Sequence, residues 1–132
     1  MDKDVYIFDL DGTLTESRSP ADTEILELFS TLLATKRVAI VSGAGLEQIQ
    51  KQILSLLPQG TNLGNLTVCP TSGASMYIFD GAHAQKVYDQ AFSQEELQQI
   101  SIAIAQVLQE IQFDLSAPSY GERLVQHTGQ IS

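Results

Sequence analysis

The sequence has little cysteine and little positive charge, and each shortage excludes a class of function. Cys69 is the only cysteine, so these 132 residues hold neither an internal disulfide nor a cysteine-cluster metal site. Seven Lys and Arg residues stand against sixteen Asp and Glu residues, which gives a formal net charge of −9 at pH 7. Because a surface this acidic repels phosphates, we expect neither nucleic acid nor an anionic membrane as a partner.

Long hydrophobic runs are also missing. No stretch approaches the roughly 20 apolar residues that cross a membrane. The acidic start, Met1-Asp2-Lys3-Asp4, lacks the basic and apolar segments of a signal peptide, so we expect a cytoplasmic protein. The composition is that of a globular protein, because 43% of the residues are hydrophobic and only 17% are charged. The length of 132 residues fits one modest domain or the front part of a larger one.

The first part of the chain alternates between short β-branched runs and amphipathic stripes. The runs predict buried strands at residues 5–8, 38–41 and 66–69. The stripes predict helices within residues 23–35 and 46–57. Strands that alternate with helices imply right-handed crossovers and a parallel sheet with helices on its faces. We therefore expect an α/β fold, with the first half of a doubly wound, Rossmann-like core over residues 1–75.

The pattern changes after Pro70. Two β-like runs, at residues 75–79 and 85–88, lie on either side of Asp80-Gly81. Runs separated by a turn of this composition are typical of a β-hairpin. The sequence therefore predicts a hairpin at this point rather than another strand and helix of the core.

A helix and a final strand follow the predicted hairpin. Ser93 with Glu96 three residues later is a capping box, which predicts the start of a helix with an apolar stripe. Residues 122–132 have the composition of a strand. We assign the hairpin, the helix and the strand to part of an α+β cap domain over residues 76–132, with the boundary near residues 71–80.

The strongest chemical signal is Asp9-Leu10-Asp11-Gly12-Thr13, at the carboxyl end of the first predicted strand. Open parallel sheets bind their ligands at this edge. Asp9 and Asp11 form a pair of carboxylates that suits a hard divalent cation, and Mg²⁺ matches best. Gly12 permits a tight turn, and exposed backbone N–H groups at Gly12 and Thr13 can hold phosphoryl oxygens. The alternative is a solvated turn at a strand end, where Asp and Gly are common.

Ser42-Gly43 ends the second predicted strand at the same edge of the sheet. The Ser42 hydroxyl can donate to a phosphoryl oxygen, and a helix that starts near Ala44 would aim its N-terminal N–H groups at the same place. The alternative for Ser42 is a plain N-cap residue. Because two independent elements meet at one edge, the phosphate-site hypothesis is the stronger one.

These motifs resemble those of a known superfamily. Residues 8–15 (Phe8-Asp9-Leu10-Asp11-Gly12-Thr13-Leu14-Thr15) resemble the first signature of the haloacid dehalogenase-like phosphohydrolases, and Ser42 resembles the second. The resemblance is greatest to the subgroup of sugar-phosphate phosphatases and eukaryotic-type phosphomannomutases. Arg18 and Ser72-Gly73-Ala74 stand where that subgroup has an arginine and a Ser-Gly element. Residues 122–132 are similar to its cap strand.

The resemblance implies Mg²⁺-dependent phosphoryl transfer from a small phosphorylated metabolite, with a sugar phosphate as the expected substrate. Asp9 would be the nucleophile that forms an aspartyl-phosphate, and Asp11 would be the general acid and base. Mg²⁺ would be held by the Asp9 carboxylate and the Asp11 backbone carbonyl. The phosphoryl group would be bound by Gly12, Thr13, Ser42 and Gly43. Arg18 and Arg123 would face the substrate from the cap side; the alternative for each is a solvated surface arginine.

The family also uses groups that these 132 residues lack, namely a lysine from a third motif and aspartates from a fourth. Lys86 lies within the predicted hairpin and Asp80 and Asp89 flank it, so none matches those motifs, and His127 stands where relatives often carry arginine. We expect the front part of an enzyme that is nearly inactive alone and that forms homo-oligomers through an exposed sheet edge. The competing hypothesis is a catalytically silent chain that serves as a binding or assembly module.

Overall fold

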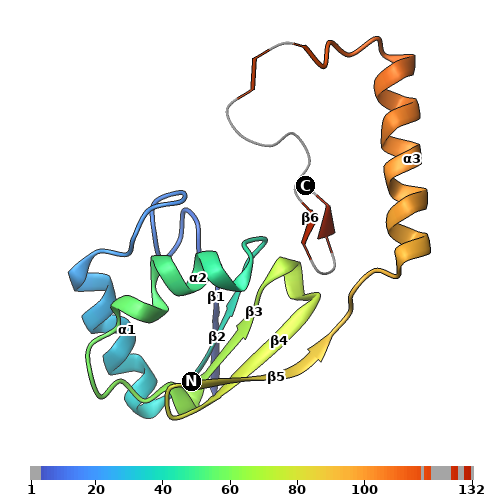
Figure 1. The fold of residues 1–132 in the computed structure, drawn as a ribbon. Helices are drawn as coiled ribbons and strands as arrows, with labels where there is room; N and C mark the ends of the chain where they lie inside the picture. The colour runs from blue at the N-terminus through green and yellow to red at the C-terminus, as the bar shows by residue number, and fades with distance from the viewer. Residues whose placement is uncertain (1–3, 117, 120–125, 128–129, 132) are drawn as a thin grey trace. The chain divides into compact units, whose positions relative to one another are not determined.

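The computed structural model describes residues 4–116, 118–119, 126–127 and 130–131. The chain forms two compact units, Met1–Asp89 and Gln90–Ser132 (Figure 1). Each unit is considered by itself below. None of the helices in the described residues is both long enough and apolar enough to cross a membrane.

A five-stranded sheet in the order β1-β2-β3-β4-β5 forms the centre of the first unit (Figure 1). Its strands are β1 (Val5–Phe8), β2 (Arg37–Val41), β3 (Leu66–Cys69), β4 (Ser75–Asp80) and β5 (His83–Asp89). The first three strands are parallel, whereas β4 runs antiparallel to β3 and β5 runs antiparallel to β4. The predicted α/β class and the predicted parallel strands are confirmed.

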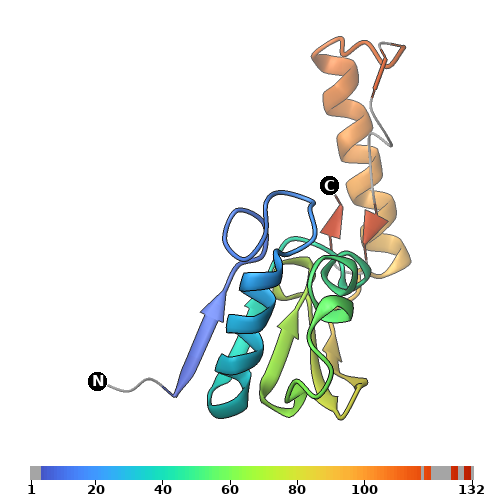
Figure 2. The ribbon, with the colours of Figure 1, turned by 90° about the vertical axis from the view of Figure 1, so that its left-hand side faces the viewer.

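Two helices, α1 (Thr23–Thr35) and α2 (Leu46–Gln52), cover one face of this sheet, and Figure 2 shows α1 lying across it. Short 3₁₀ helices lie at Leu54–Leu56, Leu63–Asn65 and Thr71–Gly73. The core beneath the helices is apolar and almost fully buried, and it includes Leu10, Phe29, Leu33, Val38, Ile40, Ile49, Ile53, Leu66 and Val68. Because side chains alternate along a strand, the residues between these core positions point to the opposite face.

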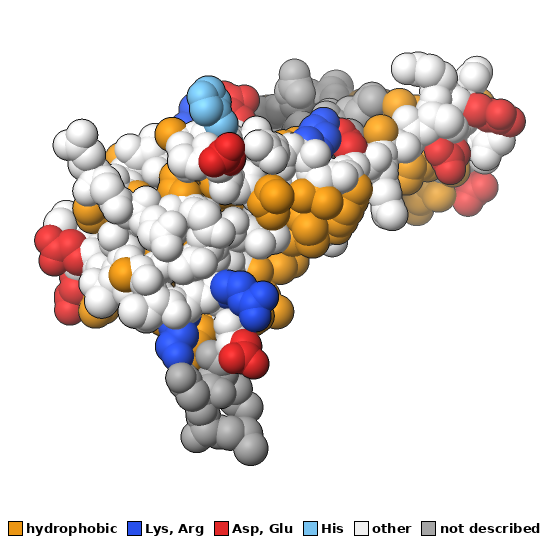
Figure 3. Space-filling model, turned by 90° about the horizontal axis from the view of Figure 1, so that it is seen from below, with side chains coloured by type: hydrophobic (Ala, Val, Ile, Leu, Met, Phe, Trp, Pro, Cys, Tyr) orange, Lys and Arg blue, Asp and Glu red, His pale blue; other side chains and the backbone are white. Residues whose placement is uncertain are grey.

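The opposite face of the sheet is apolar and exposed; we call it the open face. The strand register aligns Ile7 with Ala39, Ala39 with Thr67, and Thr67 with Ile78, so these side chains share that face. Ile7 is 68% exposed, and Ile78 is 42% exposed. Figure 3 shows hydrophobic side chains gathered in a patch on the side of the molecule seen from below. β1 lies at the sheet edge (Figure 2), with no strand on its outer side among the described residues.

The hairpin of β4 and β5 belongs to the core sheet. Thr67 and Val68 of β3 pair with Ile78 and Tyr77 of β4. A turn at Thr71–Gly73 reverses the chain, so β4 returns beside β3 instead of leading into a separate domain. The structure therefore changes from one unit to the other after Asp89, whereas the sequence analysis placed the boundary near residues 71–80. Alternation of residue types predicts a hairpin but does not say which strand the hairpin pairs with.

The second unit contains α3 (Gln94–Glu110) and two short antiparallel strands, β6 (Gln126–His127) and β7 (Gln130–Ile131). The predicted capping box is present: the Ser93 hydroxyl accepts the Glu96 N–H at 3.2 Å, and the Glu96 carboxylate accepts the Ser93 N–H at 2.8 Å. No residue of α3 is buried. The stability of this helix therefore depends on local interactions, of which the capping box is one.

The capping box predicts a pH dependence of α3. The hydrogen bond from the Ser93 backbone lowers the pKa of Glu96 below its ordinary value of 4.5. A carboxyl with a lowered pKa stabilises the helix above pH 4.5 and loses this effect as the pH falls through the lower folded value. We expect acidification to fray the first turn of α3, measured by residue-level NMR. A Glu96→Gln chain keeps an acceptor without a charge, so its first turn should not respond to pH in this range; an equal response would contradict the prediction.

Candidate functional site

The loop after β1 is folded around one backbone carbonyl. Leu10 is fully buried, and its carbonyl oxygen accepts the N–H groups of Thr13, Leu14 and Thr15 at 3.2, 2.9 and 3.0 Å. Gly12 has a φ of 75°, in the left-handed region that glycine adopts without strain, and its N–H donates to the Thr15 carbonyl at 2.7 Å. The N–H groups of Gly12 and Thr13 are therefore used inside the loop. This corrects the expectation that they are exposed to hold phosphoryl oxygens.

The two aspartates of the motif have different surroundings. The Asp9 side chain is exposed, and its Oδ1 accepts the N–H of Leu10 at 2.7 Å. The Asp11 carboxylate is held more firmly, because its Oδ1 accepts the Arg18 backbone N–H at 2.8 Å and the Gln52 amide at 3.1 Å. The bond from Arg18, with a smaller effect from Gln52, lowers the pKa of Asp11 below its ordinary value of 3.8. Asp11 is therefore a carboxylate at neutral pH.

Gln52 is a site residue that the sequence analysis missed. Its side chain lies at the end of α2 and is only 4% exposed. Its amide nitrogen contacts Asp11, Thr15 and the carbonyl of Ser19, and its amide oxygen accepts from Gln48 at 2.7 Å. The signal available in the sequence is a pair of glutamines four residues apart on a helix whose neighbouring positions are buried and apolar.

Ser42 follows β2 and lies beside the end of β3. Its hydroxyl is in a side chain only 5% exposed, and it accepts the Ala44 N–H at 3.1 Å. The helix α2 starts at Leu46 with Gly45 as its N-cap, beside the expected start near Ala44, and Ser42 is not its N-cap residue. A hydroxyl that accepts one hydrogen bond still carries a proton that it can donate.

A strained turn after β3 borders Ser42. Thr71 and Ser72 both have positive φ, at 51° and 57°, which is uncommon outside glycine. The Ser72 N–H donates to the Ser42 carbonyl at 2.8 Å, and a Cβ on Gly43 would lie 3.8 Å from the Ser72 hydroxyl. Tyr88 of β5 donates to the Gly73 carbonyl at 3.0 Å. Backbone strain of this kind persists only where neighbouring contacts enforce it, and it is concentrated at binding sites.

The structure thus brings several predicted site residues to one edge of the sheet. β1 and β2 are parallel, with Phe8 opposite Ile40, so Asp9 and Ser42 follow neighbouring strands at their carboxyl ends. Arg18 has an exposed side chain, and its backbone supports Asp11. Lys86 is paired with Asp89 on β5. Arg123 lies outside the described residues, so its predicted role stays a prediction.

The donor set of this edge fits Mg²⁺. The described residues contain no cluster of three or more His, Cys, Asp or Glu side chains placed to hold a metal. Mg²⁺ needs less than that, because it binds one or two carboxylates and takes its other ligands from water and substrate phosphate. Asp9 offers an exposed carboxylate, and Asp11 follows two residues later in the same loop. A site for Zn²⁺ or Ca²⁺ would require more protein ligands than these two residues supply.

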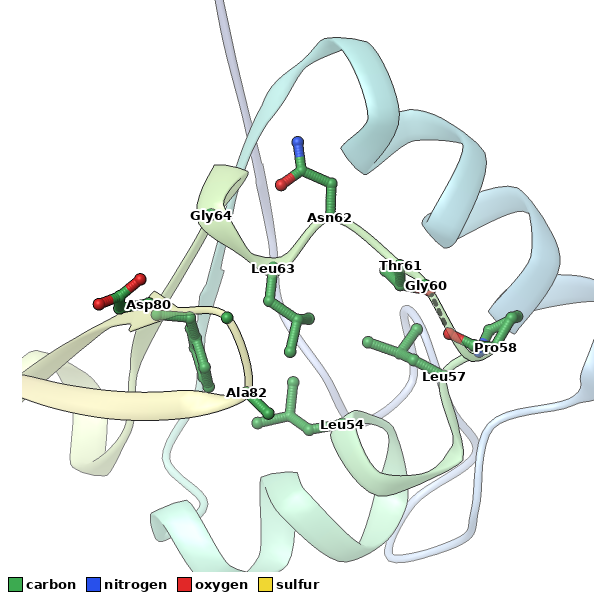
Figure 4. A pocket seen from close by; sticks show the side chains of 12 residues that line it. Leu54, Leu57, Pro58, Gly60, Thr61, Asn62, Leu63, Gly64, Asp80 and Ala82 are labelled. Carbon is green, nitrogen blue, oxygen red and sulfur yellow. Dashed lines mark hydrogen bonds between the residues drawn. The ribbon is translucent and has the colours of Figure 1, made fainter.

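A hollow of about 600 Å³ lies elsewhere in the first unit, between the β4–β5 turn and residues 54–64 (Figure 4). Leu54, Leu57 and Leu63 contribute to its wall, and Asp80 is the one charged residue that lines it. Because the β4–β5 turn lies at the amino ends of the parallel strands, this hollow is remote from Asp9 and Asp11. The candidate site is therefore identified by the carboxylates of Asp9 and Asp11 and not by the volume of a hollow.

Comparisons with solved structures identify proteins of similar fold. No protein-family model matches the sequence, and no curated protein matches it. Among solved structures, the ATP-bound IMP-nucleotidase of Plasmodium falciparum matches 97% of the chain with a TM-score of 0.70 at 19% identity. An N-terminally truncated, IMP-bound form of that enzyme matches 97% with a TM-score of 0.67 at 18% identity. A haloacid dehalogenase-like hydrolase from B. subtilis matches 83% with a TM-score of 0.60 at 14% identity.

The chain shares its fold with these solved structures, one of which is a haloacid dehalogenase-like hydrolase. Identities below one fifth support a common fold and carry no information about substrate. The chain spans 34% to 39% of the length of these structures. The shared part includes β1, β2 and β3, whose carboxyl ends carry Asp9, Asp11 and Ser42.

Proposed function

We propose that this chain provides the nucleophile and the acid–base residue of a Mg²⁺-dependent phosphoryl-transfer enzyme. The observation that carries the proposal is the pair Asp9 and Asp11 at the carboxyl end of β1, with Asp11 fixed as a carboxylate by two donors. Ser42 at the same edge adds a hydroxyl donor. The fold shared with hydrolases of known structure supports the same chemistry. Because the chain spans less than half of those structures, the activity is proposed for the whole protein.

Asp9 is the proposed nucleophile. Its carboxylate oxygen attacks the phosphorus of a phosphate monoester, an acyl-phosphate bond forms, and the bond from phosphorus to the leaving oxygen breaks. The exposed position of Asp9 suits this role, because a nucleophile must reach the substrate. Water then attacks the aspartyl-phosphate, which releases phosphate and regenerates the carboxylate; a sugar hydroxyl in place of water would make the enzyme a mutase.

Asp11 is the proposed general acid and base. In the first step it gives a proton to the leaving oxygen, and in the second it takes a proton from the attacking water. Its lowered pKa keeps Asp11 deprotonated, which is the form that accepts a proton in the second step. The first step requires the protonated form, which the negative charge of a bound phosphate monoester favours, since a nearby like charge opposes ionisation.

Asp9 and Asp11 would hold Mg²⁺, which when bound would reduce the repulsion between the acidic site and an anionic ester. Ser42 would donate its hydroxyl proton to a phosphoryl oxygen. Arg18 would face the substrate with its exposed guanidinium, and Arg123 has the same proposed role. A cytoplasmic location is part of the same proposal.

The proposed substrate is a small phosphorylated metabolite, and a sugar phosphate is our first choice because the motifs resemble the sugar-phosphate phosphatase and phosphomannomutase subgroup. The solved structures with the same fold include complexes with IMP and with ATP, so a nucleotide is the competing substrate. A nucleoside monophosphate and a sugar phosphorylated on its hydroxymethyl group both present a phosphate monoester on a primary carbon outside the ring, and the same edge of the sheet could bind either.

The test is capture of the covalent intermediate. The whole protein is mixed with Mg²⁺ and a set of sugar phosphates and nucleoside monophosphates, quenched, and reduced with borohydride, which converts an aspartyl-phosphate into homoserine. Peptide mass spectrometry then identifies the converted residue. Conversion at Asp9 that requires Mg²⁺ supports the proposal. Hydrolysis of these esters without conversion at Asp9 would refute it, and the absence of both reactions would favour the competing binding module.

The Ser42 hydroxyl provides a second test. Replacing Ser42 by Ala removes one hydrogen bond to a charged phosphoryl group, a loss of roughly 1.5–3 kcal/mol. We expect kcat/KM to fall by about 10–100-fold. Ser55→Ala is the matched control, because Ser55 is exposed and its hydroxyl bonds only to the Gln50 carbonyl. Equal kinetics for the Ser42→Ala protein and the wild type would leave Ser42 with no role beyond its bond to Ala44.

A further inference from the structure

We propose that Gln52 is a positioning residue that sets the orientation of the Asp11 carboxylate for proton transfer; this inference rests on the proposed function. No motif pointed to Gln52, and its role follows from the contacts of one buried amide. Those contacts fix the loop after β1, the Asp11 carboxylate and the end of α2 relative to one another.

The amide nitrogen of Gln52 faces three oxygen atoms. It lies 3.1 Å from Asp11 Oδ1, 3.2 Å from the Thr15 hydroxyl and 2.9 Å from the Ser19 carbonyl oxygen. A carboxylate and a carbonyl can only accept, so the group that faces them must be the amide nitrogen and not the amide oxygen. The amide oxygen in turn accepts the Gln48 amide at 2.7 Å, which fixes the same orientation from the other side.

The backbone of Gln52 also bonds to the chain that follows the loop. Its carbonyl oxygen accepts the Ala21 N–H at 2.8 Å. The side chain of Gln52 therefore hydrogen-bonds to Asp11 at one end of this loop, and its main chain hydrogen-bonds to Ala21 at the other end. The neighbouring Ile49 and Ile53 are fully buried, so α2 cannot rotate to carry Gln52 away. Leaving a buried amide without hydrogen-bond partners costs free energy, and this cost stabilises the observed orientation of Gln52.

The two oxygens of the Asp11 carboxylate differ in their contacts, and the Gln52 amide holds one of them as an uncharged donor. Both close donors, Gln52 and the Arg18 backbone, bind Oδ1. Oδ2 has only the distant Gln48 amide, at 3.4 Å. The geometry leaves Oδ2 as the oxygen that passes its proton to the leaving oxygen and recovers one from water.

The first experiment measures geometry without activity. Amide hydrogen exchange is recorded by NMR for the wild-type chain and for Gln52→Met, which keeps the length of the side chain but has no donor. We expect the Arg18 amide, which donates to Asp11, to exchange at least about tenfold faster. The Ala21 amide donates to the Gln52 backbone, which the substitution leaves in place, so its exchange should not change. Gln50→Met on the exposed side of α2 is the matched control and should change neither amide.

Two exchange results would overturn the inference. Unchanged exchange at Arg18 would show that Gln52 does not hold the Asp11 carboxylate. Faster exchange at both Arg18 and Ala21 would show that the substitution unfolds the end of α2, which is a structural role and not positioning.

The second experiment measures the role in proton transfer, in the protein that hydrolyses phosphate esters. A general acid matters most for a poor leaving group, so Gln52→Met should lower kcat for an alkyl phosphate about tenfold more than kcat for p-nitrophenyl phosphate. Equal losses for both esters would overturn the inference. A wild-type protein that hydrolyses neither ester would instead refute the proposed function, and with it any proton transfer for Gln52 to support.

Discussion

Replacing Asp9 by Asn is expected to abolish phosphoryl transfer and trapping of the aspartyl-phosphate. An amide oxygen is a weak nucleophile and cannot form the acyl phosphate, and an amide is also a poorer ligand for Mg²⁺ than a carboxylate. The loss should appear in kcat, because the covalent step itself disappears. The measurement is steady-state hydrolysis of a phosphate monoester together with borohydride trapping.

Two further variants are needed to interpret the Asp9→Asn result. Asp22→Asn is the matched control, since Asp22 precedes α1, is exposed, and makes no side-chain capping bond. It should leave turnover unchanged. Asp11→Asn should slow phosphoenzyme formation from an alkyl phosphate but leave it measurable with a good leaving group, which needs less protonation. Near-normal turnover in the Asp9→Asn protein would show that another residue is the nucleophile.

The second large effect concerns association of the 132-residue chain. β1 has no strand on its outer side among the described residues, and the open face beside it exposes Ile7 and Ile78. Unpaired edges and contiguous apolar surface both recruit other chains. We expect concentration-dependent dimers or larger species in sedimentation velocity experiments. Association should increase with salt, because each copy carries a net charge of −9 that salt screens.

A charge on the open face, at the edge strand β1, tests where association occurs. Ile7→Lys should shift the equilibrium toward monomer, because burying an unpaired ammonium group costs far more than burying isoleucine. Leu28→Lys is the matched control: Leu28 is 60% exposed on α1, which covers the other face. It should associate as the wild type does. A monodisperse monomer at all concentrations would contradict the prediction, and equal effects of both substitutions would place the contact elsewhere.

Much of the first unit could be predicted from its sequence, because its elements follow from local patterns. The strand at Val5–Phe8 and the helix at Thr23–Thr35 have the predicted bounds. Pro58 ends the second helical stripe as expected, although α2 stops earlier, at Gln52, and a 3₁₀ turn at Leu54–Leu56 continues the stripe. The capping box of Ser93 and Glu96 was also predicted correctly, since both partners lie within one turn.

The features that could not be predicted depend on how the loop after β1 folds and on what packs against it. Gly12 and Thr13 were expected to offer their N–H groups to phosphate, but Thr15 and Leu10 accept them within the loop. Gln52 looked like an ordinary polar helix residue, and its role arises only when α2 packs against the loop that follows β1. The spacing of Gln48 and Gln52 indicates a polar pair on the helix but does not identify Asp11 as its partner.

The antiparallel hairpin of β4 and β5 has a consequence for the order in which the sheet forms. Its strands are joined by the short turn after Asp80, so their pairing closes only a small loop, whereas β1 and β2 must wait until α1 has crossed between them. Local contacts form before distant ones, because closing a long loop costs more entropy. We expect the hairpin to form first and β3 to add to it, with β1 the last strand to join. Asp9 and Asp11 would then reach their places only when folding of the unit is complete.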